Sequence, residues 1–220
     1  MCGRFSLTVN EAELNERFLL SGGIEPYEAR YNCAPTQMLA VISNADRRKI
    51  SYFFWGLIPS WAKDMKIGAK MINAKAETIL EKASFRKAFS CRRCLVPATS
   101  FFEWKQDKVK TPHVIKLFGG EIFSLAGIWE EWKSPAGVLV NSFSIITTEA
   151  NKAMKPLHHR MPVILSKQDE NIWISDSSQG ELMKLLQPCP DEWLEIYPVS
   201  GLVNSPRNDV PEVLLPAEIE

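Results

Sequence analysis

The sequence predicts an α+β fold: a single domain over residues 1–220, built mainly from antiparallel or mixed β-sheet, barrel-like, with peripheral helices. Three observations lead to this prediction. The chain is long enough to bury one sizeable core. Short runs of strand-forming residues outnumber helical patterns along it. It also shows no repeat, linker or low-complexity segment that would divide it.

Composition excludes several classes of protein. Lys plus Arg and Asp plus Glu number 26 each, so the net charge is zero and any nucleic-acid site must be a local patch. No apolar run approaches the roughly 18 residues of a membrane span, and the start lacks the regions of a signal peptide. The five cysteines are irregularly spaced, which argues against a disulfide framework. We therefore expect a cytoplasmic protein, or a nuclear one in a eukaryote, without a membrane partner.

The first quarter of the chain predicts one helix and three extended segments. Residues 10–20 are amphipathic, with Asn10 as N-cap and Glu13 completing a capping box, and the glycines at 22–23 are expected to end the helix. The extended segments are expected at residues 30–35, 38–43 and 49–55.

The stretch 53–61 is unusually aromatic and is broken into a loop by Gly56 and Pro59. Phe53 and Trp55 are expected in the core. Trp61 follows the proline and stands near Lys63, so it is the better candidate for an exposed stacking surface.

The densest basic stretch of the chain begins at Lys75, within the segment 73–78, and a short helix is expected next, at residues 79–82. Aromatic residues interleave with its cations, as on phosphate-contacting surfaces, although an ordinary solvated face would give the same pattern. Its cations are Lys75, Lys82, Arg86, Lys87, Arg92 and Arg93.

Residues 94–98 and 101–105 predict two strands. Alternation places Phe102 and Trp104 on one face of the second strand, and Phe101 and Glu103 on the other. A carboxylate half-buried among aromatics has its pKa raised toward the range of a general acid or base. The alternative for Glu103 is an exposed strand charge.

No metal or organic cofactor is expected. Cys91 and Cys94 form a lone CxxC without a second pair at zinc spacing, and three histidines in all leave few further ligands.

The second half of the chain predicts three more strands, a capped turn of helix, two helices and a last strand. Gly119–Gly120 is expected to be a hairpin turn, and Thr147 to begin the segment that caps a short helix. The strands are expected at residues 113–118, 121–129, 138–147 and 196–200, and the helices at 166–173 and 179–187.

Two of the three histidines stand together, His158 and His159, directly before Arg160. Histidine is the side chain best suited to proton transfer near pH 7. Without carboxylates or cysteines nearby, the pair is a poor metal site.

The residue with the most distinctive chemistry is Cys2. Once Met1 is removed, Cys2 carries an α-amine and a thiol on adjacent carbons, with ordinary pKa values of about 8 and about 8.5. Such a 1,2-aminothiol can form an imine with an aldehyde and close to a thiazolidine, or it can attack an amide as an N-terminal nucleophile. A frayed terminus is the alternative.

Taken in order, six motifs resemble the SOS response-associated peptidase (SRAP) family of abasic-site processing proteins over nearly the whole chain. Each motif alone is weakly specific, whereas the ordered set is highly specific. The motifs occupy residues 1–5, 30–35, 55–59, 73–78, 102–104 and 158–162.

The resemblance implies a sensor of abasic sites in single-stranded DNA that acts in the DNA damage response. Cys2 would crosslink to the ring-opened sugar as a thiazolidine, with Asn73 orienting the terminus, Glu103 deprotonating the amine and His158 passing a proton to the sugar oxygen. The family name implies a peptidase-like removal of Met1, and we expect a monomer. The resemblance and the basic stretch together suggest contacts to DNA from Arg4, Trp61, Lys75, Arg86, Trp104, Thr147 and Arg160. Lys75 stands where arginine is common, which loses bidentate phosphate geometry.

Two other functions remain open from the sequence. Class II glutamine amidotransferases also begin Met-Cys-Gly, so an N-terminal-nucleophile amidohydrolase is one, although glutamine-binding and oxyanion motifs are not found downstream. The other is a non-covalent module for single-stranded DNA in which Cys2 is incidental, which predicts salt-sensitive binding that ignores the lesion.

Overall fold

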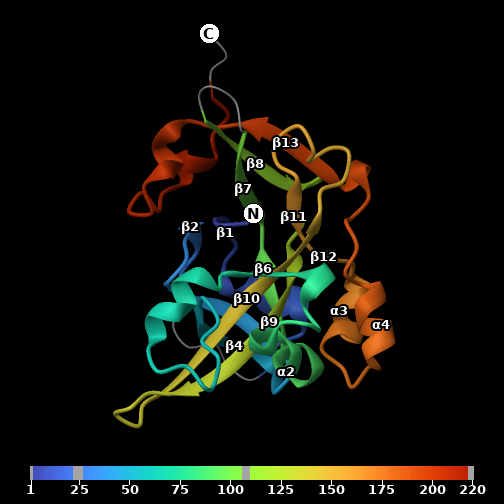
Figure 1. The fold of residues 1–220 in the computed structure, drawn as a ribbon. Helices are drawn as coiled ribbons and strands as arrows, with labels where there is room; N and C mark the ends of the chain where they lie inside the picture. The colour runs from blue at the N-terminus through green and yellow to red at the C-terminus, as the bar shows by residue number, and fades with distance from the viewer. Residues whose placement is uncertain (1, 22–26, 106–109, 218–220) are drawn as a thin grey trace.

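The computed structural model describes residues 2–21, 27–105 and 110–217, and its two β-sheets and peripheral helices confirm the α+β prediction (Figure 1). The strands are β1 (Phe5–Leu7), β2 (Arg30–Cys33), β3 (Met38–Ser43), β4 (Asp46–Trp55), β5 (Asn73–Lys75), β6 (Arg93–Ala98), β7 (Ser100–Lys105), β8 (Thr111–Leu117), β9 (Phe123–Lys133), β10 (Leu139–Glu149), β11 (Arg160–Pro162), β12 (Ile164–Leu165) and β13 (Leu194–Pro198). The α-helices are α1 (Glu11–Phe18), α2 (Ala83–Cys91), α3 (Lys167–Trp173) and α4 (Gln179–Lys184). The 3₁₀ helices are η1 (Met65–Lys70), η2 (Ala76–Thr78), η3 (Asp191–Trp193), η4 (Gly201–Asn204) and η5 (Pro211–Leu214).

The larger sheet closes on itself, as the barrel-like prediction requires. Its strands run in the order β10-β4-β3-β6-β9, and β9 pairs back with β10. The β4–β10 pairing is parallel, with Ser142 opposite Phe54, and the other pairings of the ring are antiparallel. Closure removes the exposed strand edges that an open sheet would leave. The short strands β5, β11 and β12 extend this sheet beyond the ring.

The smaller sheet is antiparallel, in the order β13-β8-β7-β1-β2. One of its faces contributes Phe101 and Ile115 to the same core cluster as the barrel residue Trp55. The other face, with Phe102, is covered by Val203 of η4 and further residues of the C-terminal segment. Because side chains alternate between the two faces of a strand, the neighbouring residues Phe101 and Phe102 of β7 pack in two different hydrophobic clusters.

The α-helices pack on the outside of the barrel. Alternation along β3 sends Val41 into the cluster shared with the smaller sheet and Ile42 into a second cluster. Helices α1 to α4 supply Leu14, Phe89, Trp173 and Leu182 to this second cluster. Within the described ranges, no helix combines the length and apolar character needed to cross a membrane.

Most elements lie where the sequence places them. Helix α1 has the predicted capping box, in which Asn10 accepts from the Glu13 N–H and Glu13 accepts from the Asn10 N–H. The helix ends at Leu19, which takes the left-handed conformation with φ 54°. The helix therefore ends before the glycines at 22–23, which lie outside the described residues. Phe53 and Trp55 are buried in the core as predicted.

The prediction of a short helix at residues 79–82 is wrong. Residues 76–78 form the 3₁₀ helix η2, residues 79–81 are turns, and α2 begins only at Ala83. Lys82 precedes α2 in an extended conformation. Of the basic side chains of this stretch, only Arg86 and Lys87 lie on α2.

The prediction of a hairpin turn at Gly119–Gly120 is also wrong. Both glycines have positive φ, as a tight turn requires. However, β8 before them pairs with β7 and β13, whereas β9 after them pairs with β6, β10 and β12. The turn connects a strand of the smaller sheet to a strand of the larger sheet. The residues of a turn do not indicate whether the strands on either side pair with each other.

The helix expected after Thr147 does not form. Thr147 lies inside β10, opposite Lys75 of β5 and Pro162 of β11. The segment that follows, residues 152–157, consists of turns. Its Pro156 has no N–H to donate to a helix, and residues before a proline avoid helical conformation.

Gly56 provides a test of the barrel packing, because its φ is +135° and an added Cβ would lie 2.5 Å from the Gly68 carbonyl oxygen. We expect Gly56→Ala to lower the free energy of unfolding by about 3 kcal/mol or more, from backbone strain and overpacking together. Urea unfolding measures it. The control is Gly180→Ala in α4, where an added Cβ meets nothing within 4 Å and the change should stay below about 1 kcal/mol. Equal effects at both positions would contradict the steric argument.

Candidate active site

Cys2 is held inside the protein rather than frayed. It is fully buried and belongs to the core cluster shared by the barrel and the smaller sheet. The Nδ2 of Asn73 donates to the Cys2 carbonyl oxygen at 2.8 Å. Asn73 reaches this point because β5 pairs in parallel with β10, with Asn73 opposite Ile145. The backbone of the residue with the most distinctive chemistry is therefore fixed.

The other amide atom of Asn73, Oδ1, is buried without a hydrogen-bond partner within the described residues. A buried acceptor that is left unsatisfied costs about 1–3 kcal/mol. A bound ligand or an ordered water is one way to satisfy such an atom. Asn73 can therefore hold the Cys2 backbone with one atom and accept from a bound molecule with the other.

Glu103 lies on β7 and is 4% exposed. Its neighbour Phe101 packs in the first core cluster and Phe102 in the cluster beneath the C-terminal segment, so the predicted alternation is confirmed. Burial raises the pKa of Glu103, although the Trp104 N–H, which donates to its Oε1 at 3.3 Å, opposes the shift. The prediction of a carboxyl with a raised pKa is thereby confirmed.

Cys2 and Glu103 interact electrostatically. Burial first, and then the charge of Glu103, raise the pKa of the Cys2 thiol to about 12. At pH 7 a thiol with that pKa is ionised in only about one molecule in 10⁵. In the described state Cys2 is therefore a neutral thiol beside a basic carboxylate.

His158 stands on the segment just before β11, with its ring stacked on His159 at 4.3 Å between centroids. Its Nδ1 lies 2.9 Å from the Arg160 backbone nitrogen, whose N–H can only donate, and 3.3 Å from the Arg160 carbonyl oxygen, which can only accept. The shorter contact favours the neutral tautomer with its proton on Nε2. Burial first, and then nearby positive charge that includes Arg160, lowers the pKa of His158, although the hydrogen bond with the Arg160 backbone opposes the shift. Near neutral pH this ring therefore presents an N–H donor.

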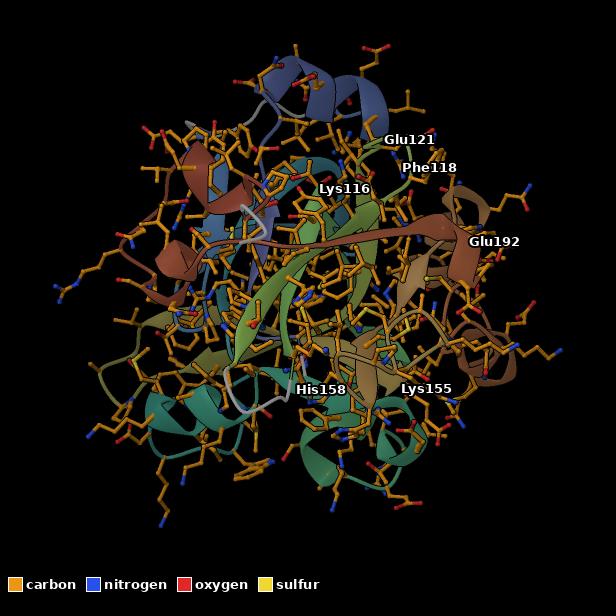
Figure 2. The ribbon with its side chains drawn as sticks, turned by 90° about the horizontal axis from the view of Figure 1, so that it is seen from above. Lys116, Phe118, Glu121, Lys155, His158 and Glu192 are labelled. Carbon is orange, nitrogen blue, oxygen red and sulfur yellow. The ribbon has the colours of Figure 1, made fainter. Side chains whose placement is uncertain are left out.

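Figure 2 looks down on the molecule and shows His158 and Lys155 well apart from Phe118 and Glu121, which follow β8. Phe118 and Glu121 line a separate cavity of about 440 Å³ with Trp193. That cavity contains no residue of the predicted site.

Arg160 and Thr147 lie together and are buried. Two nitrogens of the Arg160 guanidinium contact the two carboxylate oxygens of Glu77 at 2.7 and 2.9 Å, and one of them donates to the Thr147 carbonyl oxygen at 2.6 Å. The third nitrogen, Nε, has no partner within the described residues. The sequence analysis gave Glu77 no role, and its only sequence signal is that it belongs to the motif that contains Asn73.

Arg4 and Trp104 lie together on the face of the smaller sheet that the C-terminal segment covers. The Arg4 guanidinium stands 5.9 Å from the Trp104 ring centroid and bonds Asn32 and the Val203 carbonyl oxygen. The Trp104 Nε1 donates to Asn204 at 2.7 Å. Alternation along β7 places Trp104 on the opposite face of the strand from Glu103, and Arg4 lies beside Trp104 on that face.

Lys75 and Trp61 are exposed, and the exposure predicted for Trp61 is confirmed at 61%. Lys75 and Asn73 share one face of β5, so Lys75 stands next to the group that contacts Cys2. Arg86 is exposed on α2, whose buried residues pack in the second core cluster rather than in the one that contains Cys2. The structure therefore brings Lys75, but not Arg86, to the Cys2 group.

Within the part of the chain that the structure describes, no three His, Cys, Asp or Glu side chains cluster in a way that could hold a metal ion. The two cysteines of the CxxC differ in surroundings: Cys91 is exposed at the end of α2, and Cys94 is buried in β6.

The arrangement combines a buried cysteine, a basic carboxyl and an amide that fixes the cysteine backbone, with an imidazole donor on a neighbouring segment of the same core. Such groups suit the addition of a nucleophile to a carbonyl, in which protons must be both removed and supplied. Burial excludes water from the cysteine, which strengthens each electrostatic interaction there.

Comparison with known proteins places this arrangement in context. Residues 1–206 match the family described as SOS response associated peptidase (SRAP). The abasic site processing protein YoqW of Bacillus subtilis (strain 168) is 43% identical over 97% of this chain and 99% of its own. The abasic site processing protein HMCES of Gallus gallus is 30% identical over 100% of this chain and 79% of its own. A crystal structure of a protein from Bacteroides thetaiotaomicron superposes with a TM-score of 0.90 at 30% identity, over 99% of this chain and 100% of that one.

Proposed function

Because the chain belongs to the SOS response associated peptidase family, we propose that it processes abasic sites in single-stranded DNA by capturing them covalently through Cys2 once Met1 has been removed. Relatives over nearly the whole chain are named abasic site processing proteins. The ring-opened sugar at such a site carries an aldehyde, the electrophile that a 1,2-aminothiol traps best. The peptidase-like step of the family name would here be the removal of Met1.

The observation that carries the proposal is the burial of Cys2 between Asn73 and Glu103. A cysteine without a role at this position would be expected to fray into solvent. Here its carbonyl is hydrogen-bonded and its thiol interacts with a carboxyl whose pKa burial has raised. These are the groups that imine and thiazolidine formation need.

The first step joins the amine of Cys2 to the aldehyde carbon. As the sugar ring opens, the C1 hydroxyl loses its proton and the ring oxygen takes one up. The Nε2–H of neutral His158 donates a hydrogen bond to that oxygen and stabilises the negative charge that develops on it. Glu103 takes a proton from the α-ammonium group, and the freed amine adds to the aldehyde carbon. Protonation of the resulting hydroxyl lets it leave as water, which gives the imine.

The second step closes the five-membered ring. The Cys2 sulfur adds to the imine carbon, its proton passes to Glu103, and the imine nitrogen takes up a proton. The product is a thiazolidine, and the only molecule released is one water. A thiol pKa of about 12 favours this order, because the amine, with an ordinary pKa of about 8, is the better nucleophile at neutral pH.

We propose that the DNA strand runs past this site along a local basic surface. Lys75 lies beside Asn73 and would attract a phosphate, and exposed Trp61 would stack on a base. We propose that the protein acts as a monomer. Further DNA contacts are proposed for Arg4, Arg86, Trp104, Thr147 and Arg160. Arg86 is exposed, whereas the other four would need local rearrangement to reach DNA. Arg4, Thr147 and Arg160 are buried, and Trp104 is half-buried.

The two alternatives fit the structure less well. An amidohydrolase needs the thiolate as its first nucleophile, and the raised pKa of Cys2 opposes this. A non-covalent binding module needs no buried Cys2 beside a carboxyl.

A denaturing gel tests the proposal. Processed protein is mixed with single-stranded DNA that carries one abasic site, and with the same strand intact. We expect a heat-stable shifted band only with the abasic strand. If folded, Met1-free protein gives no such band and hydrolyses glutamine instead, the proposal is wrong.

Asn73→Ala is expected to slow crosslinking by about tenfold. The change removes the hydrogen bond to the Cys2 carbonyl, so the aminothiol loses its fixed position, and misplacement by about 1 Å can cost up to about 10²-fold in rate. Band formation over time on the gel measures the rate. Lys70→Ala, an exposed residue at the end of η1, serves as control. A rate unchanged from wild type would contradict the role of Asn73.

A further inference from the structure

The Arg160 side chain joins three elements of the fold. It extends from the first residue of β11 and contacts Glu77 in η2 and Thr147 in β10. The Arg160 side chain is 9% exposed, whereas that of Glu77 is 44% exposed. A buried guanidinium needs a counter-charge, and Glu77 supplies it in the bidentate geometry that fixes both position and orientation.

The backbone of the same residue determines the state of His158. The Arg160 N–H donates to His158 Nδ1 at 2.9 Å, whereas the Arg160 carbonyl oxygen, the acceptor that would favour a proton on Nδ1, lies at 3.3 Å. The shorter bond favours the neutral ring with its proton on Nε2. The hydrogen bond spans only two residues, so its geometry depends on where the first residue of β11 lies. Whatever anchors Arg160 therefore also sets the tautomer and direction of the imidazole.

We propose that Glu77 is a positioning residue: by anchoring Arg160, it holds His158 as an Nε2–H donor toward the reacting sugar. This inference rests on the proposed function, since His158 acts there as the hydrogen-bond donor to the sugar ring oxygen. Glu77 does not touch the reacting atoms. It acts through two links, from its carboxylate to the guanidinium and from the Arg160 backbone to the ring.

The competing role for Glu77 is electrostatic. As the partner of Arg160, it could simply compete with a DNA phosphate for the guanidinium. Its removal would then tighten DNA binding and leave His158 unchanged. The positioning role predicts a changed ring and a slower maximal reaction instead, so the two roles differ in what they alter.

The test compares Glu77→Gln with Glu149→Gln. Glu149 lines the same cavity of about 540 Å³ as Glu77, and its Cα is paired with that of Arg160 in the β10–β11 ladder. The structure gives it no contact with the Arg160 guanidinium, whose carboxylate partner is Glu77. The two variants therefore carry the same substitution, lose the same charge and line the same cavity. They differ in that only Glu77→Gln loses a contact with the Arg160 guanidinium.

Two readouts are needed. The first is the tautomer of His158 in the free protein, from long-range ¹H–¹⁵N spectra of histidine-labelled samples. The second is the crosslinking rate against the concentration of abasic single-stranded DNA, which separates the maximal rate from the half-saturating concentration. We expect Glu77→Gln to populate both tautomers and to lower the maximal rate by about 10- to 100-fold, whereas Glu149→Gln matches wild type in both.

An unchanged tautomer would overturn the inference, even if the rate fell, and so would a change in half-saturating concentration alone. If the wild-type protein formed no crosslink, the proposed function would fail, and the tautomer comparison would still show whether Glu77 positions His158. Should Glu77→Gln not fold, Arg160→Lys keeps a positive charge but loses the bidentate pair, and the same two changes are expected.

Discussion

Cys2→Ala is expected to abolish heat-stable capture of abasic single-stranded DNA, reducing the shifted band to background. Alanine retains the α-amine after removal of Met1, so an imine can still form. Without the sulfur, the imine cannot close to a thiazolidine, and water reverses it. The band on a denaturing gel measures the stable product, and borohydride reduction of a parallel sample reveals the imine.

The matched control blocks the other nucleophile. Processed wild-type protein whose α-amine has been acetylated keeps the thiol and is expected to give no band either. Full crosslinking by this form, or by protein that retains Met1, would contradict the aminothiol mechanism, because the thiol would then act alone.

Glu103→Gln is expected to slow crosslinking by about 10²- to 10³-fold at neutral pH, because general acid–base groups contribute about 10²–10⁴-fold. The amide has nearly the same shape but cannot accept the proton of the α-ammonium group. The rate is followed on the same gel at saturating DNA. A rate within twofold or threefold of wild type would show that Glu103 is not the base.

The pH profile gives a second check on Glu103. Burial raises its pKa, so the carboxyl stays protonated, and unable to accept a proton, to a higher pH than an ordinary glutamate. The wild-type rate should therefore rise as the pH passes upward through this raised pKa. Glu103→Gln should lose that rise and keep only the dependence due to the α-amine near pH 8.

Glu103→Gln should slow crosslinking without lowering the free energy of unfolding. A raised carboxyl pKa means that the folded protein binds this proton more tightly than the unfolded chain, so ionised Glu103 disfavours folding above its pKa. At neutral pH, Glu103→Gln should unfold at the same urea concentration as wild type or at a higher one. A low rate in this variant would then not be the result of unfolding.

Local elements of the fold could be predicted because their signals are local. The capping box of Asn10 lies within four residues, and the faces of β7 follow from the alternation of Phe101, Phe102 and Glu103. The raised pKa of Glu103 could be anticipated for the same reason, since its aromatic neighbours adjoin it in the chain.

Elements that depend on long-range pairing were missed. Nothing near Gly119 shows that β8 and β9 belong to different sheets, and Thr147 looks like a helix cap until β5 and β11 pair on either side of it. In both places tertiary pairing overrides the local signal.

The candidate site divides in the same way. The chemistry of Cys2 follows from its residue type, but its contact with Asn73, 71 residues away, follows only from the parallel pairing of β5 with β10. The pair of Glu77 and Arg160 joins positions 83 residues apart, and a lone glutamate in the sequence gives no sign of it.

The most direct test of the central claim is the intact mass of the product formed with a short single-stranded DNA that carries one abasic site. The account predicts the mass of the protein without Met1 plus that of the DNA, less one water, with fragmentation placing the added mass on Cys2. An added mass on a lysine, or a product that keeps Met1, would contradict covalent capture by the N-terminal aminothiol.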